Sequence, residues 1–199
     1  MVLLAIASLF LGVLYGLSGT DLGLITILVS HTDFILYILM FLVGISVGMH
    51  RGIIDKIKEY HIKIFIIPVG IIVGSIAGGL VCAAFLPLSL GESTAIASGL
   101  GWYSLAGVSI TNLYGAAIGS TAFLSNLMRE IFSFFSIPWI SKHLNYYSCI
   151  APAAATSEDT TLPMLIKYTN PETVVLAVFN GAFLSALVPF LISFCYHIF

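Results

Sequence analysis

Five apolar segments, each long enough to cross a lipid bilayer, constrain this chain more than any other feature of its sequence. A transmembrane helix needs about 20 predominantly apolar residues. The segments close to this length cover residues 2–19, 34–50, 63–88, 118–140 and 172–197. We therefore predict an all-α polytopic membrane protein with about five full transmembrane helices, forming one membrane domain over residues 1–199.

The composition supports this fold class and excludes several others. Only 8% of the 199 residues are charged, whereas soluble domains carry about 25%, and the mean hydropathy is +1.10. The net charge is −2, and the sequence lacks the basic stripe that nucleic-acid binding requires. A soluble enzyme, a nucleic-acid binder and a disordered regulator are therefore excluded. The lipid bilayer is the expected environment.

The basic residues predict how the spans are oriented. Four of the seven Lys and Arg residues lie in the loop 50–63, and the positive-inside rule places such a loop in the cytoplasm. The N-terminus, which lacks the basic region of a signal peptide, is then cytoplasmic, and the C-terminus is outside. We expect the multi-pass protein in the plasma (inner) membrane of a prokaryote.

Two further segments, 92–117 and 149–168, resemble neither lipid-facing spans nor solvated loops. Both are rich in Gly, Ala, Ser and Thr, with Gly or Pro near their middles. The tetrapeptides IASG (96–99) and IAPA (150–153) lie 54 residues apart. This pattern is typical of interrupted helices in transporters with inverted repeats. The segments are either re-entrant hairpins, which the positive-inside rule favours, or broken helices that span the membrane.

Glycines spaced four residues apart, such as Gly70, Gly74 and Gly78, allow helix backbones to approach closely. We expect this ridge to pack against another helix within the protomer rather than at a dimer interface.

Charged residues inside a span are costly and mark candidate functional sites. Arg129 and Glu130 lie near the middle of the segment 118–140. On a helix Glu130 shares a face with Asn126 and Ser133, which favours a functional role, while Arg129 points about 100° away. For Arg129 a structural ion pair and a functional role are both open.

The stretch TSEDTTLP (156–163) places two adjacent carboxylates, Glu158 and Asp159, among four hydroxyl groups. Exposed backbone and hydroxyls at a helix break can coordinate a cation, and repulsion between neighbouring carboxylates suits a proton carrier. The alternative is an N-cap cluster on a short helix. We favour the functional reading, with Asp159 ahead of Glu158.

In the segment 92–117, aromatic residues beside glycines could cover a cationic ligand or belong to a membrane-interface belt. No His spacing fits a metal site, and no nucleophile–base set is present, so neither a metal, a cofactor nor an enzymatic activity is expected. The predicted residues for substrate or protons are Glu130, Asp159, Glu158, Asn126, Trp102, Tyr103, Ser104, Thr156, Ser157, Thr160 and Asn112.

Three motifs together resemble the LysO family of bacterial L-lysine exporters: GLGWYSLAG (99–107), NLMRE (126–130) and ATSEDTTLP (155–163). The resemblance covers roughly residues 1–199, corresponding to the C-terminal two thirds of a full-length member. It implies export of L-lysine, or a similar cationic amino acid, against protons, with Glu130 and Asp159 as the acidic pair needed for transport.

The chain departs from the family pattern in three respects. Glu158 stands where the family usually has Met, and Ala154 or Ala155 stands where Gly is typical. The N-terminal region of the family is absent. This implies either that the chain works as a homodimer or that a small partner subunit supplies the missing region. The alternatives to lysine export are a Na⁺/H⁺-type cation antiporter and a non-transporting subunit of a two-protein membrane complex.

Overall fold

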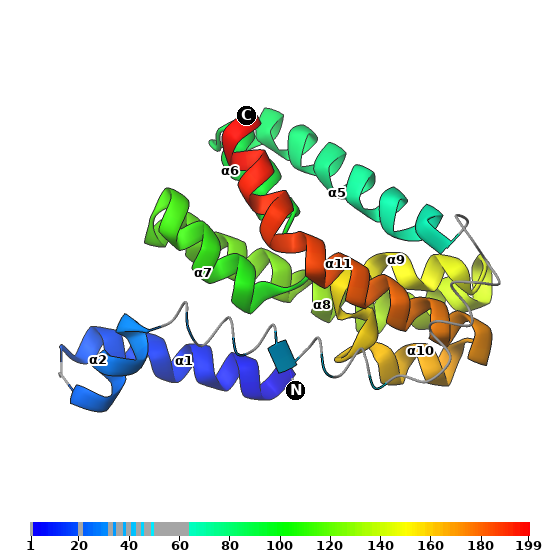
Figure 1. Ribbon diagram of the computed structural model, residues 1–199, viewed down its shortest axis with the longest axis horizontal. Helices are drawn as coiled ribbons and strands as arrows, with labels where there is room; N and C mark the ends of the chain where they lie inside the picture. Colours follow the sequence, from blue (N-terminus) through cyan, green and yellow to red (C-terminus); the bar gives the residue numbers. More distant parts are fainter. Residues whose placement is uncertain are drawn as a thin grey trace. The chain divides into compact units, whose positions relative to one another are not determined.

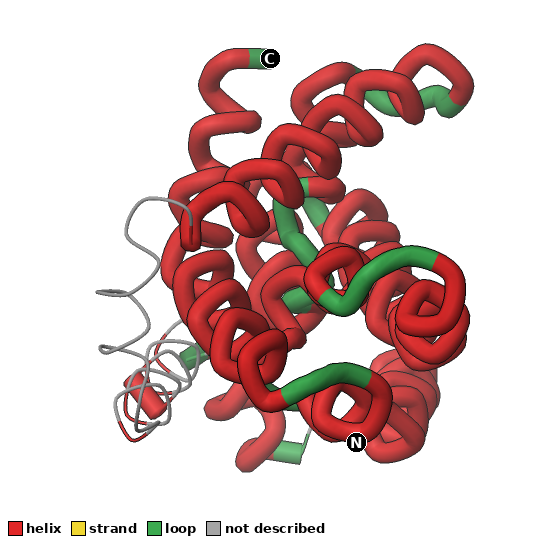
Figure 2. The backbone as a smooth tube through the Cα atoms, turned by 90° about the vertical axis from the view of Figure 1, so that its right-hand side faces the viewer, coloured by secondary structure: helices red, strands yellow, loops and turns green. Residues whose placement is uncertain are grey.

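The computed structural model describes residues 2–19, 22–31 and 64–199, together with residues 34, 38, 41, 42, 45 and 49. Within these residues the chain forms helices and connecting loops and no strand, which confirms the all-α prediction (Figure 1, Figure 2). The α-helices are α1 (Val2–Ser18), α2 (Gly23–Ser30), α5 (Ile66–Phe85), α6 (Leu90–Ala97), α7 (Tyr103–Tyr114), α8 (Ala116–His143), α9 (Ile150–Ala153), α10 (Leu162–Tyr168) and α11 (Pro171–Ile198). Two short 3₁₀-helices, η2 (Tyr147–Cys149) and η3 (Ala154–Glu158), flank α9.

The chain divides into two compact units, residues 1–42 and 43–199. In the first unit α1 and α2 form a bent pair, with the segments Phe10–Ser18 and Gly23–Ser30 at 115° to each other. The backbone N–H of Leu22 donates to the Tyr15 hydroxyl across this bend. The predicted basic loop and most of the predicted span 34–50 lie outside the described residues, and the single-domain prediction stays a prediction.

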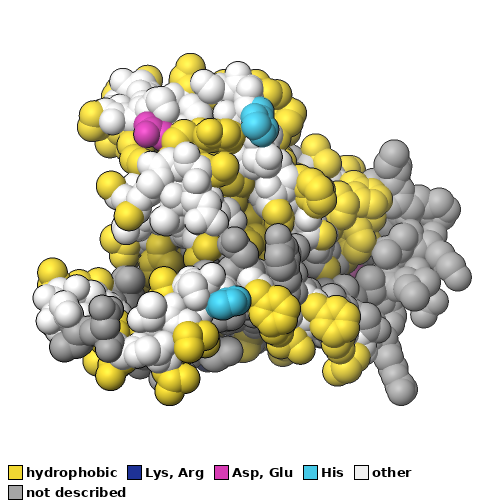
Figure 3. Space-filling view, turned by 60° about the vertical axis from the view of Figure 1, so that its left-hand side comes forward, with side chains coloured by type: hydrophobic (Ala, Val, Ile, Leu, Met, Phe, Trp, Pro, Cys, Tyr) yellow, Lys and Arg dark blue, Asp and Glu magenta, His cyan; other side chains and the backbone are white. Residues whose placement is uncertain are grey.

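Among the described helices, α5 and α11 are long and apolar enough to cross a membrane, and the bent pair could form a third span. The helix α8 is equally long, with 28 residues, but is too polar to meet the same criterion. Many large hydrophobic side chains on the described helices are exposed, and charged groups are rare on the face that Figure 3 shows. The protein is therefore membrane-embedded, and the full number of spans stays a prediction.

The first interrupted segment folds back on itself as a hairpin, residues 86–115. Its helix α6 begins with a capping box, in which the Ser89 hydroxyl accepts from the Glu92 N–H and the Glu92 carboxylate accepts from the Ser89 N–H. The start of α6 at Gly91 lies against the backbone of Phe199. The end of α7 also reaches the last turn of α11, where the rings of Tyr114 and Tyr196 are 5.1 Å apart. Both ends of the first hairpin therefore lie at the C-terminal end of α11.

The second interrupted segment forms a hairpin, residues 144–170, at the opposite end of α11. Near its start the Tyr147 hydroxyl donates to the carboxylate of Glu172, in the first turn of α11. Its last residue, Asn170, caps α11 by accepting from the Thr173 N–H. Since α8 connects one hairpin to the other, α8 and α11 run in opposite directions (Figure 1). The geometry thus favours the re-entrant reading of both segments.

The tips of the two hairpins meet. Leu100 and Gly101 in the first tip and Ala154 in the second have positive φ angles, which reverse the chain where the helices break. The Ala155 N–H donates to the Leu100 carbonyl at 3.0 Å. Leu100 and Ala154 are 54 residues apart, as are the two similar tetrapeptides, and α8 and α11 each contain 28 residues. Each half is therefore a hairpin followed by a long helix, in inverted orientation.

The glycine ridge of α5 does not make the predicted helix contact within the described part of the chain. A Cβ on Gly70, Gly74 or Gly78 would have no described atom within 4 Å. The close approach to α6 occurs instead at Gly79, where a Cβ would lie 2.9 Å from the Cα of Thr94. The packing face is thus the one containing Gly79, and the ridge faces a cavity.

Candidate functional site

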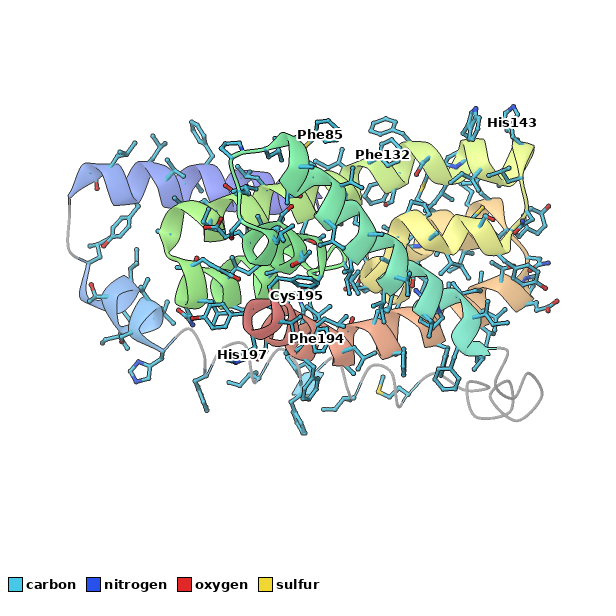
Figure 4. All side chains as sticks on the ribbon, turned by 90° about the horizontal axis from the view of Figure 1, so that it is seen from above. Phe85, Phe132, His143, Phe194, Cys195 and His197 are labelled. Atoms are coloured by element: carbon cyan, nitrogen blue, oxygen red, sulfur yellow. The ribbon has the colours of Figure 1, made fainter. Side chains whose placement is uncertain are left out.

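Glu130 is the most deeply buried acidic group among the described residues. It lies in the middle of α8, and only 1% of its surface is exposed. Phe132, two positions further along α8, is 65% exposed and projects outward (Figure 4), so the helix presents an apolar outer face and a polar inner one. Neither carboxylate oxygen of Glu130 has a hydrogen-bond partner among the described residues. A buried carboxylate without partners is costly, which marks a place for a proton or a cation.

The second hairpin brings Asp159 and Thr160 towards Glu130. The Thr160 hydroxyl lies beside the Glu130 carboxylate, although it completes no hydrogen bond of normal geometry and is itself buried without a partner. Asp159 is exposed, and its carboxylate accepts from the Thr160 N–H. From the first hairpin, Tyr103 lies within electrostatic range of both carboxylates. We call Tyr103, Glu130, Asp159 and Thr160 the acidic cluster.

Asn126 is one helical turn before Glu130 and holds the first tip. Its side-chain oxygen accepts from the Gly101 N–H at 2.8 Å, and its amide donates to the carbonyls of Ile96 and Ala122. Gly99 must be a glycine here, because a Cβ would lie 2.6 Å from the Asn126 amide nitrogen. Asn126 therefore positions the tip rather than extending the acidic cluster.

Asn180 of α11 plays the corresponding part for the second tip. Its amide donates to the Ala154 carbonyl at 3.0 Å and to the Ser157 hydroxyl at 3.1 Å. Asn126 and Asn180 are 54 residues apart, the spacing that relates the two tips. The sequence reasoning missed Asn180, although the same spacing could have identified it.

Thr156 and Ser157, both predicted to bind substrate or protons, form bonds within the protein. Thr156 donates to the Ala153 carbonyl, and Ser157 donates to the Ala177 carbonyl of α11. These hydroxyls hold the second tip together and fix it on α11. Hydroxyl-to-carbonyl bonds of this kind stabilise the backbone where the helix is interrupted.

Glu158 faces α11 and lies apart from Glu130. The Ser185 hydroxyl donates to its carboxylate at 2.9 Å, and its backbone lies close to Gly181, where a Cβ would be 2.6 Å from the Glu158 nitrogen. The adjacent carboxylates of the second tip thus point in different directions. Asp159 joins the acidic cluster and Glu158 does not.

The other residues predicted in the first segment separate along α7. Trp102 and Ser104 are half-buried at its start, near the tip. Asn112 is exposed and lies about 13 Å further along the helix axis, at 1.5 Å per residue. The structure therefore does not bring Asn112 to the acidic cluster.

Arg129 points to a different face of α8 from Glu130. Its guanidinium donates to the Ser75 hydroxyl of α5 and to the carbonyls of Ala151 and Pro152 in the second hairpin. No acidic side chain among the described residues pairs with it, so the ion-pair reading finds no support there. In the same residues no group of His, Cys, Asp and Glu is arranged to hold a metal ion.

Comparisons with known proteins agree on one family. A family model described as lysine exporter LysO matches residues 6–196. The chain is 36% identical over 184 residues to "Lysine exporter LysO" of Escherichia coli (strain K12), covering 92% of this chain and 60% of that protein. It is 36% identical over 163 residues to "Putative lysine exporter" of Haemophilus influenzae (strain ATCC 51907 / DSM 11121 / KW20 / Rd), covering 81% and 82% respectively. No solved structure matches the chain.

Proposed function

The chain belongs to the lysine exporter LysO family, and from this premise we propose that it exports L-lysine, or a similar cationic amino acid, in exchange for protons. The family consists of exporters, which favours transport over catalysis. The chain spans about 60% of the Escherichia coli relative, so the substrate and the coupling ion are part of the proposal.

The buried and unpartnered carboxylate of Glu130 carries the proposal. A carboxylate at membrane depth is tolerated when it holds a proton or a cation. Glu130 and Asp159 bind the ammonium groups of the substrate when they are charged, and they release it when they are protonated. Protons that enter from outside therefore release the amino acid on the outside. When these protons leave to the cytoplasm, the two carboxylates are charged again and can bind the next substrate.

The hairpins supply the alternating access that this exchange needs. They enter from opposite ends of the bundle and meet through the Ala155–Leu100 hydrogen bond. Tyr103 belongs to one hairpin and Asp159 to the other, so movement of either hairpin opens the acidic cluster to one side. This arrangement matches inverted-repeat transporters, in which interrupted helices form the site near the midplane. In this reading the protein lies in the inner membrane with its C-terminus outside.

The proposal is tested by counterflow of labelled L-lysine in proteoliposomes that contain this chain. We expect exchange that an imposed pH gradient accelerates. Glu130→Gln should reduce the rate by at least about 30-fold, because losing one partner of a buried charge pair costs about 2–5 kcal/mol. Asp159→Asn should also reduce the rate, since it removes the second carboxylate of the acidic cluster. Glu172→Gln is the matched control, since it removes a carboxylate that accepts a hydrogen bond from Tyr147 at the start of α11 and lies outside the acidic cluster.

Three outcomes would contradict the proposal or part of it. Counterflow that Glu130→Gln and Asp159→Asn leave unchanged contradicts the role of the acidic cluster. Exchange without any response to the pH gradient contradicts proton coupling. Absence of exchange from the chain alone, followed by exchange when a partner subunit is added, favours the two-protein complex over a homodimer. If neither Glu130→Gln nor Asp159→Asn changes lysine exchange by that complex, this chain is a non-transporting subunit.

A Na⁺/H⁺-type antiporter is the second candidate, because Glu130 and Thr160 offer oxygen atoms without partners. Oxygen ligands of this kind would suit a bare cation equally well. Na⁺-driven proton movement in the same proteoliposomes, with no lysine exchange, would favour it.

A further inference from the structure

A cavity of about 550 Å³ lies on the Arg129 side of α8, between α5, α6, α8 and α9. Its lining includes the glycine ridge Gly70, Gly74 and Gly78 and the polar groups Ser75, Ser125 and Arg129. Glu130, Glu158 and Asp159 are not among its lining residues. Its volume falls within the usual range for small-molecule sites, about 300–1,000 Å³.

The shape of the cavity depends on the glycine ridge. A Cβ on Gly70, Gly74 or Gly78 would meet no described atom within 4 Å, so the absence of side chains there leaves open space in front of Ser75 and Arg129. The neighbouring Gly79, by contrast, packs closely against α6. One face of α5 holds the helix in place, and the adjacent face bounds the cavity.

The charge of Arg129 has no counterion within the described part of the chain. Its three hydrogen bonds to described residues go to one hydroxyl and two carbonyls, none of which carries a negative charge. A guanidinium has five N–H groups in a planar fork, so two remain for a ligand. An uncompensated positive charge at membrane depth is costly, and a carboxylate held by the fork is the partner that its geometry favours.

We infer that this cavity binds the carboxylate of the exported amino acid and that Arg129 is the group that holds it. The inference rests on the proposed function and adds a recognition element for the anionic part of the substrate. Arg129 and Glu130 are consecutive residues, so they lie within one turn of α8, on faces about 100° apart. The inferred ligand therefore places its carboxylate in the cavity and directs its side-chain ammonium group towards the acidic cluster on the neighbouring face.

Arg129 bonds to the second hairpin and lies close to the tip of the first. A Cβ on Gly101 would lie 3.8 Å from its Cδ, and its donors reach the Ala151 and Pro152 carbonyls of the second hairpin. A carboxylate bound in the cavity would therefore contact Arg129, the side chain that lies between the two hairpins.

The test compares L-lysine with 1,5-diaminopentane, which lacks only the carboxylate, as competitors of labelled L-lysine counterflow. With the wild type, we expect the diamine to compete at least tenfold less well than lysine. Arg129→Gln should raise the KM for lysine about tenfold or more, because hydrogen bonds to charged groups contribute more than neutral ones. Competition by the diamine should be unchanged, so the preference for lysine is lost.

Two further variants keep the test decisive if Arg129→Gln does not fold. Gly74→Leu adds a side chain at a position where a Cβ meets no described atom within 4 Å, so it occupies the cavity and should raise the KM for lysine. Val73→Leu enlarges an exposed neighbour on α5 that does not line the cavity, so it should leave the KM for lysine unchanged.

A preference for lysine that persists in Arg129→Gln, or normal lysine kinetics in a folded Gly74→Leu, overturns the inference while the proposed function stands. In those cases Arg129 serves the hairpin carbonyls, or meets another anion such as a lipid phosphate. A wild type that exchanges no lysine overturns the proposed function, and this inference with it.

Discussion

At the scale of single residues, the buried polar side chains differ in how completely they are bonded. Asn126 bonds to the backbone of the first hairpin, and Ser157 of the second hairpin bonds to the backbone of α11. Glu130 and Thr160, by contrast, have buried oxygen atoms without a hydrogen-bond partner among the described residues. Buried polar groups in proteins are normally paired. Asn126 and Ser157 therefore maintain the structure, whereas Glu130 and Thr160 belong to the site that we propose for the substrate.

Asn126 gives a direct test of this division. Asn126→Ala removes two hydrogen bonds to the first hairpin and a third to Ala122 within α8, and it leaves the buried Gly101 N–H without this partner. The free energy of unfolding should fall by about 2–3 kcal/mol, which thermal unfolding in detergent would detect as a lower Tm. Ser120→Ala, which removes an exposed hydroxyl bonded within α8 itself, should change the Tm little. Equal effects of the two substitutions would contradict the positioning role of Asn126.

At the scale of elements, close packing and open space lie on adjacent faces of α5. Gly79 contacts Thr94 and Ala97 of α6, whereas a Cβ on the preceding Gly78 would meet no described atom within 4 Å. The same residue type thus serves two purposes at neighbouring positions. Four-residue spacing alone could not separate them, because it shows which glycines share a face and leaves open what that face meets.

Two substitutions on α5 distinguish these purposes. Gly79→Ala forces a Cβ to within about 3 Å of α6 and should lower the free energy of unfolding by about 1–3 kcal/mol, the usual cost of overpacking. Gly78→Ala should be tolerated, because space is open there and Ala favours helix formation. Thermal unfolding of both variants provides the measurement, and a more harmful Gly78→Ala would show that the faces are assigned incorrectly.

At the scale of the whole described bundle, the two hairpins and the two antiparallel long helices form an inverted pair. The first hairpin starts and ends beside Phe199 and Tyr196, and the second starts and ends beside the first turn of α11. Their bases therefore lie at opposite ends of the bundle. Together with the orientation that the basic loop predicts, we expect the base of the first hairpin outside and that of the second in the cytoplasm.

Cysteine labelling tests this topology. In a background with Cys82, Cys149 and Cys195 replaced by Ala, Leu86→Cys and Tyr146→Cys place single thiols at the two bases, where both native side chains are exposed. A membrane-impermeant maleimide should label Leu86→Cys from outside in intact cells and Tyr146→Cys only in inside-out vesicles. Labelling of both from the same side would contradict the re-entrant arrangement.

The membrane class, the helical secondary structure and the two interruptions were predictable, because they depend on local properties. Apolar length sets which helices can enter a bilayer, and Gly or Pro near the middle of a helical segment weakens it locally. The repeat spacing was also visible in IASG and IAPA, and it now relates Leu100 to Ala154 and Asn126 to Asn180. Of the predicted site residues, Glu130, Asp159, Thr160 and Tyr103 come together.

Other assignments required the tertiary structure. Adjacent residues looked equivalent in sequence, yet Glu158 bonds to Ser185 of α11 while Asp159 belongs to the acidic cluster. Arg129 faces a cavity beside α5, and Glu130 is buried without a partner. The sequence by itself determined which segments leave water and where their helices break, since both follow from short-range chemistry. Only tertiary contacts decided how Asn126 and Glu158 are bonded, because their partners Gly101 and Ser185 come from segments distant in the chain.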